Sequence, residues 1–311
     1  MESRSTVPEP YSMGSSLGDG WKLDQLLLSP RSLVASEKET SVSSKKILVL
    51  GDRMTDRYIR GPVTKLSPEA PVPVVGIESI EDRDGAAANV RNNILALGCP
   101  CFVIYGKGKQ ILKARIIGDG HHVVRIDHDH PQEPITVPEV AEFLPDMDIV
   151  LLIDYNKGSL RYSKEIVALC KEHGKTVLVD PKGHDWTRYH GADLIKPNVN
   201  ELREAVGGWG SRDEMIHKAQ QLREAIGIPY LLVTLARDGM VLIGEHVFAH
   251  PADCAEPVDV SGAGEATIAA FACAMARGET MEACVRLASK AAGICVSREG
   301  TTVVTAEEVF E

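Results

Sequence analysis

A short stretch near the carboxyl end of the chain combines residue types that could stabilise and move charge. Residues 258–272 read VDVSGAGEATIAAFA, in which Gly262, Ala263 and Gly264 stand directly before Glu265. The small residues permit a tight turn and the apolar residues after them are typical of a helix, so the amides of residues 262–265 would meet at a helix N-terminus and bind an anion. In phosphoryl transfer such amides stabilise charge while a carboxylate accepts the proton of the attacking hydroxyl. Glu265 is the candidate base.

This stretch has two other interpretations, of which the first stays open and the second fits poorly. The glycines could serve close packing alone, with Glu265 complementing the helix dipole. A dinucleotide fingerprint fits poorly, because Thr267 occupies the position of its last glycine and no clear strand precedes the turn. The chain also lacks the G-x-x-x-x-G-K-[ST] pattern of a P-loop.

The elements that would position this stretch alternate between strand and helix patterns. Short apolar runs over 45–52, 101–106, 148–155, 176–183, 192–198, 230–240 and 240–250 predict strands, and residues 159–174 and 211–227 predict helices. This alternation predicts an α/β fold whose parallel sheet is covered by helices on both faces. Ligands bind at the carboxyl ends of such strands, where Asp52, Asp154, Asp180 and Asn198 close four of these runs.

Two segments break the alternation and predict a small β lid. Residues 58–83 carry three prolines in six positions, at 68, 71 and 73, and show no helical period. Residues 113–129 contain a Gly-Asp-Gly hairpin signal at 118–120. The adjacent His121 and His122 would point to opposite faces of a strand, so the hairpin reading is favoured over a metal site. Exposed lid edges would be protected by pairing two copies, which predicts a homodimer through the lid.

Composition excludes several classes of protein. A net charge of −10 with scattered Lys and Arg argues against nucleic-acid binding, and no apolar run approaches the roughly 18 residues of a membrane span. The seven cysteines lie mostly in apolar segments, which favours reduced thiols and a cytoplasmic location. Residues 1–44 contain eleven serines and no sustained apolar period, which predicts a disordered tail before a single domain at 45–311.

The motifs together resemble a known family. DVSGAGE (259–265) resembles the D-[ST]-x-G-A-G-D signature of the ribokinase (PfkB) family of carbohydrate kinases, and DGAAAN (84–89) resembles its amino-terminal G-G-x-x-N signature. In order, LGDRMTDRYIRG, IDYNKG, VDPKG and KPNVNELREAVG are similar to the kinase module of bacterial heptose-7-phosphate kinases. The resemblance implies a ribokinase-like three-layer α/β sandwich with a mostly parallel central sheet. It also implies an ATP-dependent kinase acting on the anomeric hydroxyl of a heptose 7-phosphate or a related sugar phosphate.

The resemblance assigns roles to single residues. It implies sugar binding by Asp52, Asp56, Asn89, Arg125 and Asp259, and binding of ATP and Mg²⁺ by Lys196, Asn198, Glu201, Thr234 and Gly239, with Glu201 reaching Mg²⁺ through a water. It implies an anion hole at Gly262, Ala263 and Gly264 beside the base Glu265. Taken one at a time, an Asp after a strand or an Asn before a helix is often only a turn or a cap.

Three departures from the family pattern surround one pocket. Glu265 replaces the family aspartate, which moves the carboxylate outward by roughly 1 to 1.5 Å, and a shift of about 1 Å can cost on the order of a hundredfold in rate. Ala86 replaces a usual glycine, and the helix and strand that heptose kinases carry between the segments matching 101–109 and 111–117 are missing. A second function therefore stays open: a weakened or silent relative that binds nucleotide or sugar as a regulatory or scaffold protein.

Overall fold

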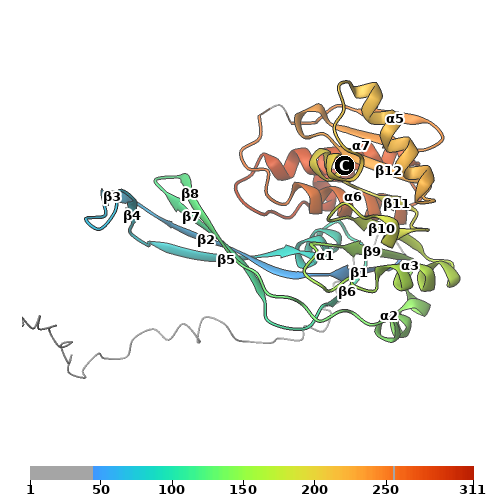
Figure 1. Ribbon diagram of the computed structural model, residues 1–311, viewed down its shortest axis with the longest axis horizontal. Coiled ribbons are helices and arrows are strands. Elements are labelled where there is room, and N and C mark those ends of the chain that lie inside the picture. Colours follow the sequence, from blue (N-terminus) through green and yellow to red (C-terminus); the bar gives the residue numbers. More distant parts are fainter. Residues whose placement is uncertain (1–44, 255) are drawn as a thin grey trace, which may run out of the picture. The chain divides into compact units, whose positions relative to one another are not determined.

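The computed structural model describes residues 45–254 and 256–311 (Figure 1). The expected disordered tail, residues 1–44, lies outside the described residues. The central sheet has eight strands in the order β14-β13-β12-β11-β10-β9-β1-β6. Their bounds are β1 Ile47–Gly51, β6 Cys101–Tyr105, β9 Ile149–Ile153, β10 Thr176–Asp180, β11 Leu194–Ile195, β12 Tyr230–Thr234, β13 Met240–Ile243 and β14 Val247–His250. The pairs from β6 through β12 are parallel, and β13 and β14 add antiparallel strands.

Helices cover both faces of this sheet, as the alternation predicts (Figure 1). One face packs against α1 Ala87–Ala96, α6 Ala263–Ala276 and α7 Met281–Val296, and the other against α2 Val137–Phe143, α3 Ser163–Glu172, α4 Val199–Val206 and α5 Arg212–Ala225. Successive residues of β1 enter opposite cores, because Ile47 and Val49 pack with the first group while Leu48 and Leu50 pack with the second. A strand buried on both faces reads as a continuous apolar run. The three-layer α/β sandwich is confirmed.

Shorter elements complete this layer arrangement. They are the single-turn helices η2 Leu144–Asp146, η3 Thr187–Tyr189 and η4 Ala236–Asp238, and the last helix, α8 Ala306–Phe310. The helix predicted over 159–174 begins later, at Ser163, because Ser159 hydrogen-bonds the Asp52 carboxylate instead of entering the helix. Within the described ranges, no helix is both long and apolar enough to cross a bilayer.

The lid is a separate sheet of four strands in the order β5-β2-β7-β8. Its strands are β2 Arg53–Gly61, β5 Ser79–Ala86, β7 Ile111–Gly118 and β8 His121–His128, and β3 Val63–Leu66 pairs with β4 Pro73–Val75 as a small ribbon. Asp119 and Gly120 join β7 to β8 with φ values of 51° and 78°, the positive values that a two-residue hairpin turn of type I′ requires. Both β segments expected from the sequence therefore form strands.

The base of the lid is tied to the loop that follows α7. The Tyr58 hydroxyl accepts a hydrogen bond from the Thr301 amide at 3.1 Å, and Arg83 donates to the Glu299 carbonyl oxygen at 2.9 Å. Arg60 forms an ion pair with the Glu299 carboxylate at 2.8 Å. These contacts fix the near end of the lid beside the turn that begins α6.

The chain passes from the central sheet to the lid without an intervening helix. β6 ends at Tyr105 and is the last strand of the sheet, and β7 begins at Ile111. The helix and strand expected of heptose kinases at this point are absent between these two described strands. β6 is therefore left as an edge strand.

Candidate active site

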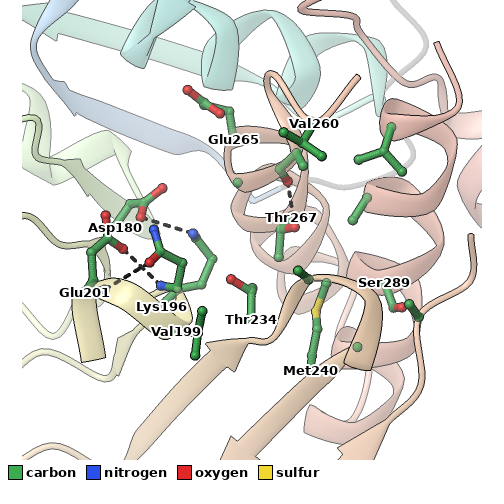
Figure 2. A pocket seen from close by; sticks show the side chains of 18 of the residues that line it. Asp180, Lys196, Val199, Glu201, Thr234, Met240, Val260, Glu265, Thr267 and Ser289 are labelled. Carbon is green, nitrogen blue, oxygen red and sulfur yellow. Dashed lines mark hydrogen bonds and ion pairs between the residues drawn. The ribbon is translucent and has the colours of Figure 1, made fainter. Parts of the chain in front are cut away.

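A pocket of about 530 Å³ opens at the carboxyl ends of the parallel strands (Figure 2). Its walls come from the residues after β9, β10, β11 and β12, from the first turn of α6, and from α7. It brings together these residues expected from the sequence: Lys196, Asn198, Glu201, Thr234, Gly239, Ala263, Gly264 and Glu265. The pocket thus lies where a parallel α/β sheet is expected to bind its ligands.

The first turn of α6 has the geometry of an anion site. Gly262 precedes the helix with φ 83° and ψ −3°, a left-handed conformation that favours glycine. A Cβ there would also lie 3.2 Å from Thr301 Cγ2 and 3.3 Å from Asn89 Nδ2. The 14-residue helix starts at Ala263, so the amides of Gly264 and Glu265 belong to its first turn, where backbone donors lack helical acceptors. An anion placed in the pocket can bind there.

Glu265 is the carboxylate at this turn, and it is partly buried (Figure 2). The Tyr155 hydroxyl donates a hydrogen bond to Glu265 Oε1. Tyr155 also lines the pocket, and it follows β9. No role for Tyr155 was expected from the sequence, although this residue stands in the IDYNKG stretch next to Asp154.

The nucleotide side of the pocket consists of groups that bind one another. Asn198 and Glu201 form a reciprocal capping box at α4: the Glu201 amide donates to Asn198 Oδ1, and the Asn198 amide donates to Glu201 Oε2, both at 2.9 Å. Lys196 is 3% exposed and pairs with Asp180 at 3.1 Å. Its Nζ would lie 3.5 Å from a Cβ placed on Gly264, so this ammonium is beside the first turn of α6 (Figure 2).

Charges in this part of the pocket shift one another's pKa values. Burial, together with Glu201 and Glu265, raises the pKa of Asp180 to about 7, although Lys196 opposes the shift. Burial disfavours the charged Lys196, but Asp180 and Glu201 outweigh it and raise the Lys196 pKa. Carboxylates thus exceed cations here, and a bound cation would relieve their repulsion.

These carboxylates fit an indirect contact to Mg²⁺. Both oxygens of Glu201 already accept hydrogen bonds, Oε2 from the Asn198 amide and Oε1 from Lys182 Nζ at 3.1 Å. Among the residues described, no group of three or more His, Cys, Asp or Glu side chains is arranged to hold a metal ion. Mg²⁺ commonly keeps several waters and binds through substrate phosphates. A water-mediated contact from Glu201 agrees with this arrangement.

On the sugar side, the structure places Asp52 away from the pocket. Asp52 is fully buried, and its carboxylate accepts hydrogen bonds from the amides of Tyr155 at 3.0 Å and of Lys157 and Ser159 at 3.3 Å. An acid at the carboxyl end of β1 is close to the amides of the loop after β9, because the two strands are neighbours. Asp52 therefore holds that loop, and its contact with a sugar stays a prediction.

Asp56 and Asn89 lie deeper, at the junction of the lid and α1. Asp56 is 8% exposed and accepts a hydrogen bond from Arg115 Nη1 at 2.5 Å. Asn89 is 2% exposed; its Oδ1 accepts from Asn93, whereas its Nδ2 has no hydrogen-bond partner among the described residues. A buried amide without an acceptor suits a ligand hydroxyl, because leaving such a donor unpaired is costly.

Arg125 and Asp259 have other partners. Arg125 lies on the outermost lid strand and forms two hydrogen bonds with Asp127, at 2.8 and 2.9 Å. Asp259 accepts from the amides of Ser261 and Gly300, both at 2.9 Å, and so shapes the turn before α6. Neither residue lines the pocket.

Ala86 occupies a backbone conformation that favours glycine. It joins β5 to α1 with φ 51° and ψ −131°, and it is buried. A residue with a Cβ in such a sparsely populated region costs on the order of 1–3 kcal/mol. The structure thus gives a backbone reason, and not only a steric one, for the glycine usual at this position.

Comparisons with known proteins agree with the fold. The family model described as pfkB family carbohydrate kinase matches residues 86–308. A D-beta-D-heptose 7-phosphate kinase of Bordetella bronchiseptica is 39% identical over 301 residues, covering 86% of this chain and 96% of the relative. A bifunctional protein HldE of Pseudomonas fluorescens is 38% identical over 295 residues, and the match spans 85% of this chain but 62% of that protein.

Solved structures share the fold at low sequence identity. Arabidopsis thaliana ribokinase complexed with ribose and ATP superposes with a TM-score of 0.71 at 18% identity, covering 86% of this chain and 98% of that one. Escherichia coli phosphofructokinase-2 in complex with fructose-6-phosphate gives 0.69 at 15% identity, covering 86% and 97%. With the family match over residues 86–308, the chain belongs to the pfkB family of carbohydrate kinases.

Proposed function

We propose that this chain is an ATP- and Mg²⁺-dependent kinase that phosphorylates the anomeric hydroxyl of a heptose 7-phosphate or a related sugar phosphate. The observation that carries the proposal is that Ala263, Gly264 and Glu265 of the first turn of α6 share one pocket with Lys196, Asn198 and Glu201. Anion-binding amides, a buried cation and a carboxylate are the groups that phosphoryl transfer needs. The relative named D-beta-D-heptose 7-phosphate kinase supports the substrate class.

The chemistry follows from the positions of these groups. The terminal phosphate of ATP binds the first-turn amides of α6 and Lys196, and Glu265 accepts the proton of the sugar hydroxyl. The hydroxyl oxygen forms a bond to the terminal phosphorus while the bond to the ADP oxygen breaks. Glu201 would hold Mg²⁺ through a water, and the ion would supply neutralisation of the phosphate charge. A positioned base of this kind typically contributes about 10²–10⁴-fold in rate.

A cluster of cations at the lid supports a phosphorylated sugar. Lys113 on β7 is partly buried, and burial lowers its pKa, with Arg125 and Lys157 close enough to act in the same direction. Lys157 forms an ion pair with Asp129 at 2.7 Å, and Arg125 forms one with Asp127 at 2.8 Å. The oxygens of a substrate phosphate would replace Asp127 and Asp129 as the partners of Arg125 and Lys157. Arg can bind two phosphate oxygens at once.

A nucleotide- or sugar-binding protein without turnover is the second candidate. One observation favours it: the described chain has no helix or strand between β6 and β7, where heptose kinases are expected to carry both. The two candidates share binding and differ in ADP formation.

The experiment is an assay of ADP release over a panel of sugar phosphates and their unphosphorylated sugars. We expect ADP to form with a heptose 7-phosphate, ³¹P NMR to show a new phosphate at the anomeric carbon, and much weaker activity with the unphosphorylated sugar. Glu265→Gln serves as the inactive control. Nucleotide binding without ADP formation on any member of the panel contradicts the kinase and leaves the binding protein.

We also propose a homodimer through the lid. Large apolar side chains are exposed there, at Leu66, Val72, Ile77, Ile80, Val123, Val124 and Ile126. All of β8 is exposed, and a bare apolar edge is protected by pairing with a second copy. Sedimentation at micromolar concentration should give a dimer that Ile126→Glu dissociates and Val247→Glu, at an exposed site on β14, does not. A monomeric wild type contradicts this assembly.

A cytoplasmic location is part of the proposal. All seven cysteines are free, and six of them are buried. Reduced thiols persist in a reducing compartment.

A further inference from the structure

The Tyr155 hydroxyl is a group at the site that the family signatures do not include. It donates to Glu265 Oε1, across 110 residues of sequence. From this contact we propose that Tyr155 is a positioning residue: it holds the longer side chain of Glu265 so that Oε2 faces the sugar hydroxyl and accepts its proton. The inference rests on the proposed kinase function and adds a residue to it.

Tyr155 is itself held in place by its backbone. Its amide donates to Asp52 Oδ2 at 3.0 Å, and Asp52 is fully buried. The next residue, Asn156, has φ 57°, and its amide donates to Asp154 Oδ1 at 2.6 Å. These hydrogen bonds fix the backbone that carries the phenol ring after the end of β9. A donor fixed in this way can set the direction of a flexible carboxylate.

The contact with Tyr155 also limits the conformational freedom of the Glu265 side chain. An added methylene gives Glu265 one more rotatable bond than the family aspartate, so its carboxylate could point in several directions. A hydrogen bond to one oxygen removes much of this freedom and leaves the other oxygen as the acceptor. Tyr155 thus compensates for the family departure that most threatens turnover.

Tyr155 stays a donor over the working pH range. Burial raises its pKa well above the ordinary value, and the carboxylates of Glu265 and Asp180 raise it further. A neutral phenol keeps its proton and can donate it in a hydrogen bond to Glu265 Oε1.

Other charged and titratable groups face this pair from the surrounding elements. Asp180 at the end of β10, Lys196 after β11 and Cys295 on α7 interact electrostatically with Glu265. From the lid, Lys113 Nζ lies 5.1 Å from the centroid of the Tyr155 ring, and Asp56 also acts on the Tyr155 pKa. These groups remain in a Tyr155→Phe variant. Their electrostatic effect on Glu265 is therefore the same in the variant and in the wild type.

The first test is Tyr155→Phe, which removes the hydroxyl and keeps the ring against Lys113. We expect kcat to fall about tenfold to a hundredfold, the value of one hydrogen bond to a charged group, with KM for ATP unchanged. Tyr105→Phe, at a partly buried tyrosine beside Arg53, is the matched control and should change neither.

A double-mutant cycle separates positioning from packing. In a Glu265→Asp background the carboxylate is too short to reach the phenol, so adding Tyr155→Phe should cost less than about twofold. An equal loss from Tyr155→Phe in both backgrounds, or a Tyr155→Phe enzyme with wild-type kcat, overturns the proposal.

A readout without turnover distinguishes this proposal from the kinase function. In protein labelled with ¹³Cζ-tyrosine, the Tyr155 resonance should shift in Glu265→Ala and Glu265→Asp, while the Tyr105 resonance stays in place. These variants change only a side chain in the first turn of α6, so they also serve if Tyr155→Phe fails to fold. An unmoved Tyr155 resonance refutes the contact. A shifted resonance in a protein that releases no ADP retains the pair and refutes the kinase.

Discussion

The nucleotide side of the pocket and the junction of the lid with α1, where we propose that the sugar binds, differ in how their polar groups are satisfied. On the nucleotide side, Asn198 caps α4 together with Glu201, and Lys196 pairs with Asp180. On the sugar side, Asn89 Nδ2 has no hydrogen-bond partner among the described residues, and Ala86 has a positive φ. The first side is completed by the fold itself, whereas the second holds an unpaired donor and local strain. Such features persist at sites where a ligand or the chemistry uses them.

The largest effect is expected at the point where the two sides meet. Glu265→Gln removes the proton acceptor but keeps the shape of the side chain, so kcat should fall about a thousandfold. The Kd for ATP should stay within about twofold, since the amides and Lys196 serve binding. Single-turnover kinetics and nucleotide titration measure both quantities. Equal activity in Glu265→Gln and the wild type would remove Glu265 from the mechanism.

Glu265→Asp sharpens the same comparison. From the sequence, aspartate is expected to raise kcat, because it restores the family residue. The Tyr155 contact reverses this expectation, since aspartate cannot reach the phenol, and we expect a lower kcat in the variant. A faster Glu265→Asp enzyme would show that the turn before α6, and not Tyr155, determines the position of the carboxylate.

Lys196→Met should have the largest effect on stability. It leaves Asp180 buried without its cation, which typically costs about 3–5 kcal/mol in free energy of unfolding. The paired replacement Lys196→Met with Asp180→Leu should recover most of this loss, because two apolar groups leave no charge unpaired. Urea unfolding of the three proteins tests this. A stable Lys196→Met variant would mean that the nucleotide side is not held by its own ion pair.

Asn89→Ala should affect sugar binding more than stability, in contrast to Lys196→Met. Because Asn89 Nδ2 has no hydrogen-bond partner in the part of the chain that the structure describes, its loss should raise KM for the sugar about tenfold to a hundredfold, the value of one ligand hydrogen bond of roughly 1.5–3 kcal/mol. KM for ATP should not change, and the loss of stability should be smaller than in Lys196→Met. The control is Asn92→Ala on the same helix, whose amide already donates to Asp84. An unchanged sugar KM contradicts the role of Asn89.

Ala86→Gly should stabilise the protein. It releases strain of about 1–3 kcal/mol and loses about 0.4–1 kcal/mol to the more flexible unfolded chain, for a net gain of about 1 kcal/mol. Ala87→Gly, one residue later and inside α1, should instead destabilise by roughly 0.5–1 kcal/mol. Denaturant midpoints of the two variants that move in the same direction would contradict the strain at Ala86.

The smallest effect is expected from deletion of residues 1–44. This segment has no apolar period to bury, so Tm should be nearly unchanged. A large fall in Tm by calorimetry would show that the segment packs on the domain.

Local patterns in the sequence predicted much of the fold and half of the site. The strand and helix alternation, the turn at Gly262–Gly264 and the hairpin at 118–120 each depend on residues close in sequence. The N-x-x-E spacing of Asn198 and Glu201 also indicates a capping box, because both partners stand in one helical turn. The sugar side was harder to predict, since Asp52 and Asp259, which were expected to bind substrate, accept hydrogen bonds from backbone amides of segments that no local pattern identifies.

The sequence by itself determined which chemistry the chain carries: a glycine turn before a helix, a carboxylate at its start, and acids at the ends of apolar strands. Periodicity and turn chemistry are local, so they can be read along the chain. The tertiary structure decided which side chains meet, such as Tyr155 with Glu265 and Lys196 with Asp180. Parallel strands bring residues far apart in sequence to one edge of the sheet, and the direction of each side chain there depends on neighbours that no local pattern specifies.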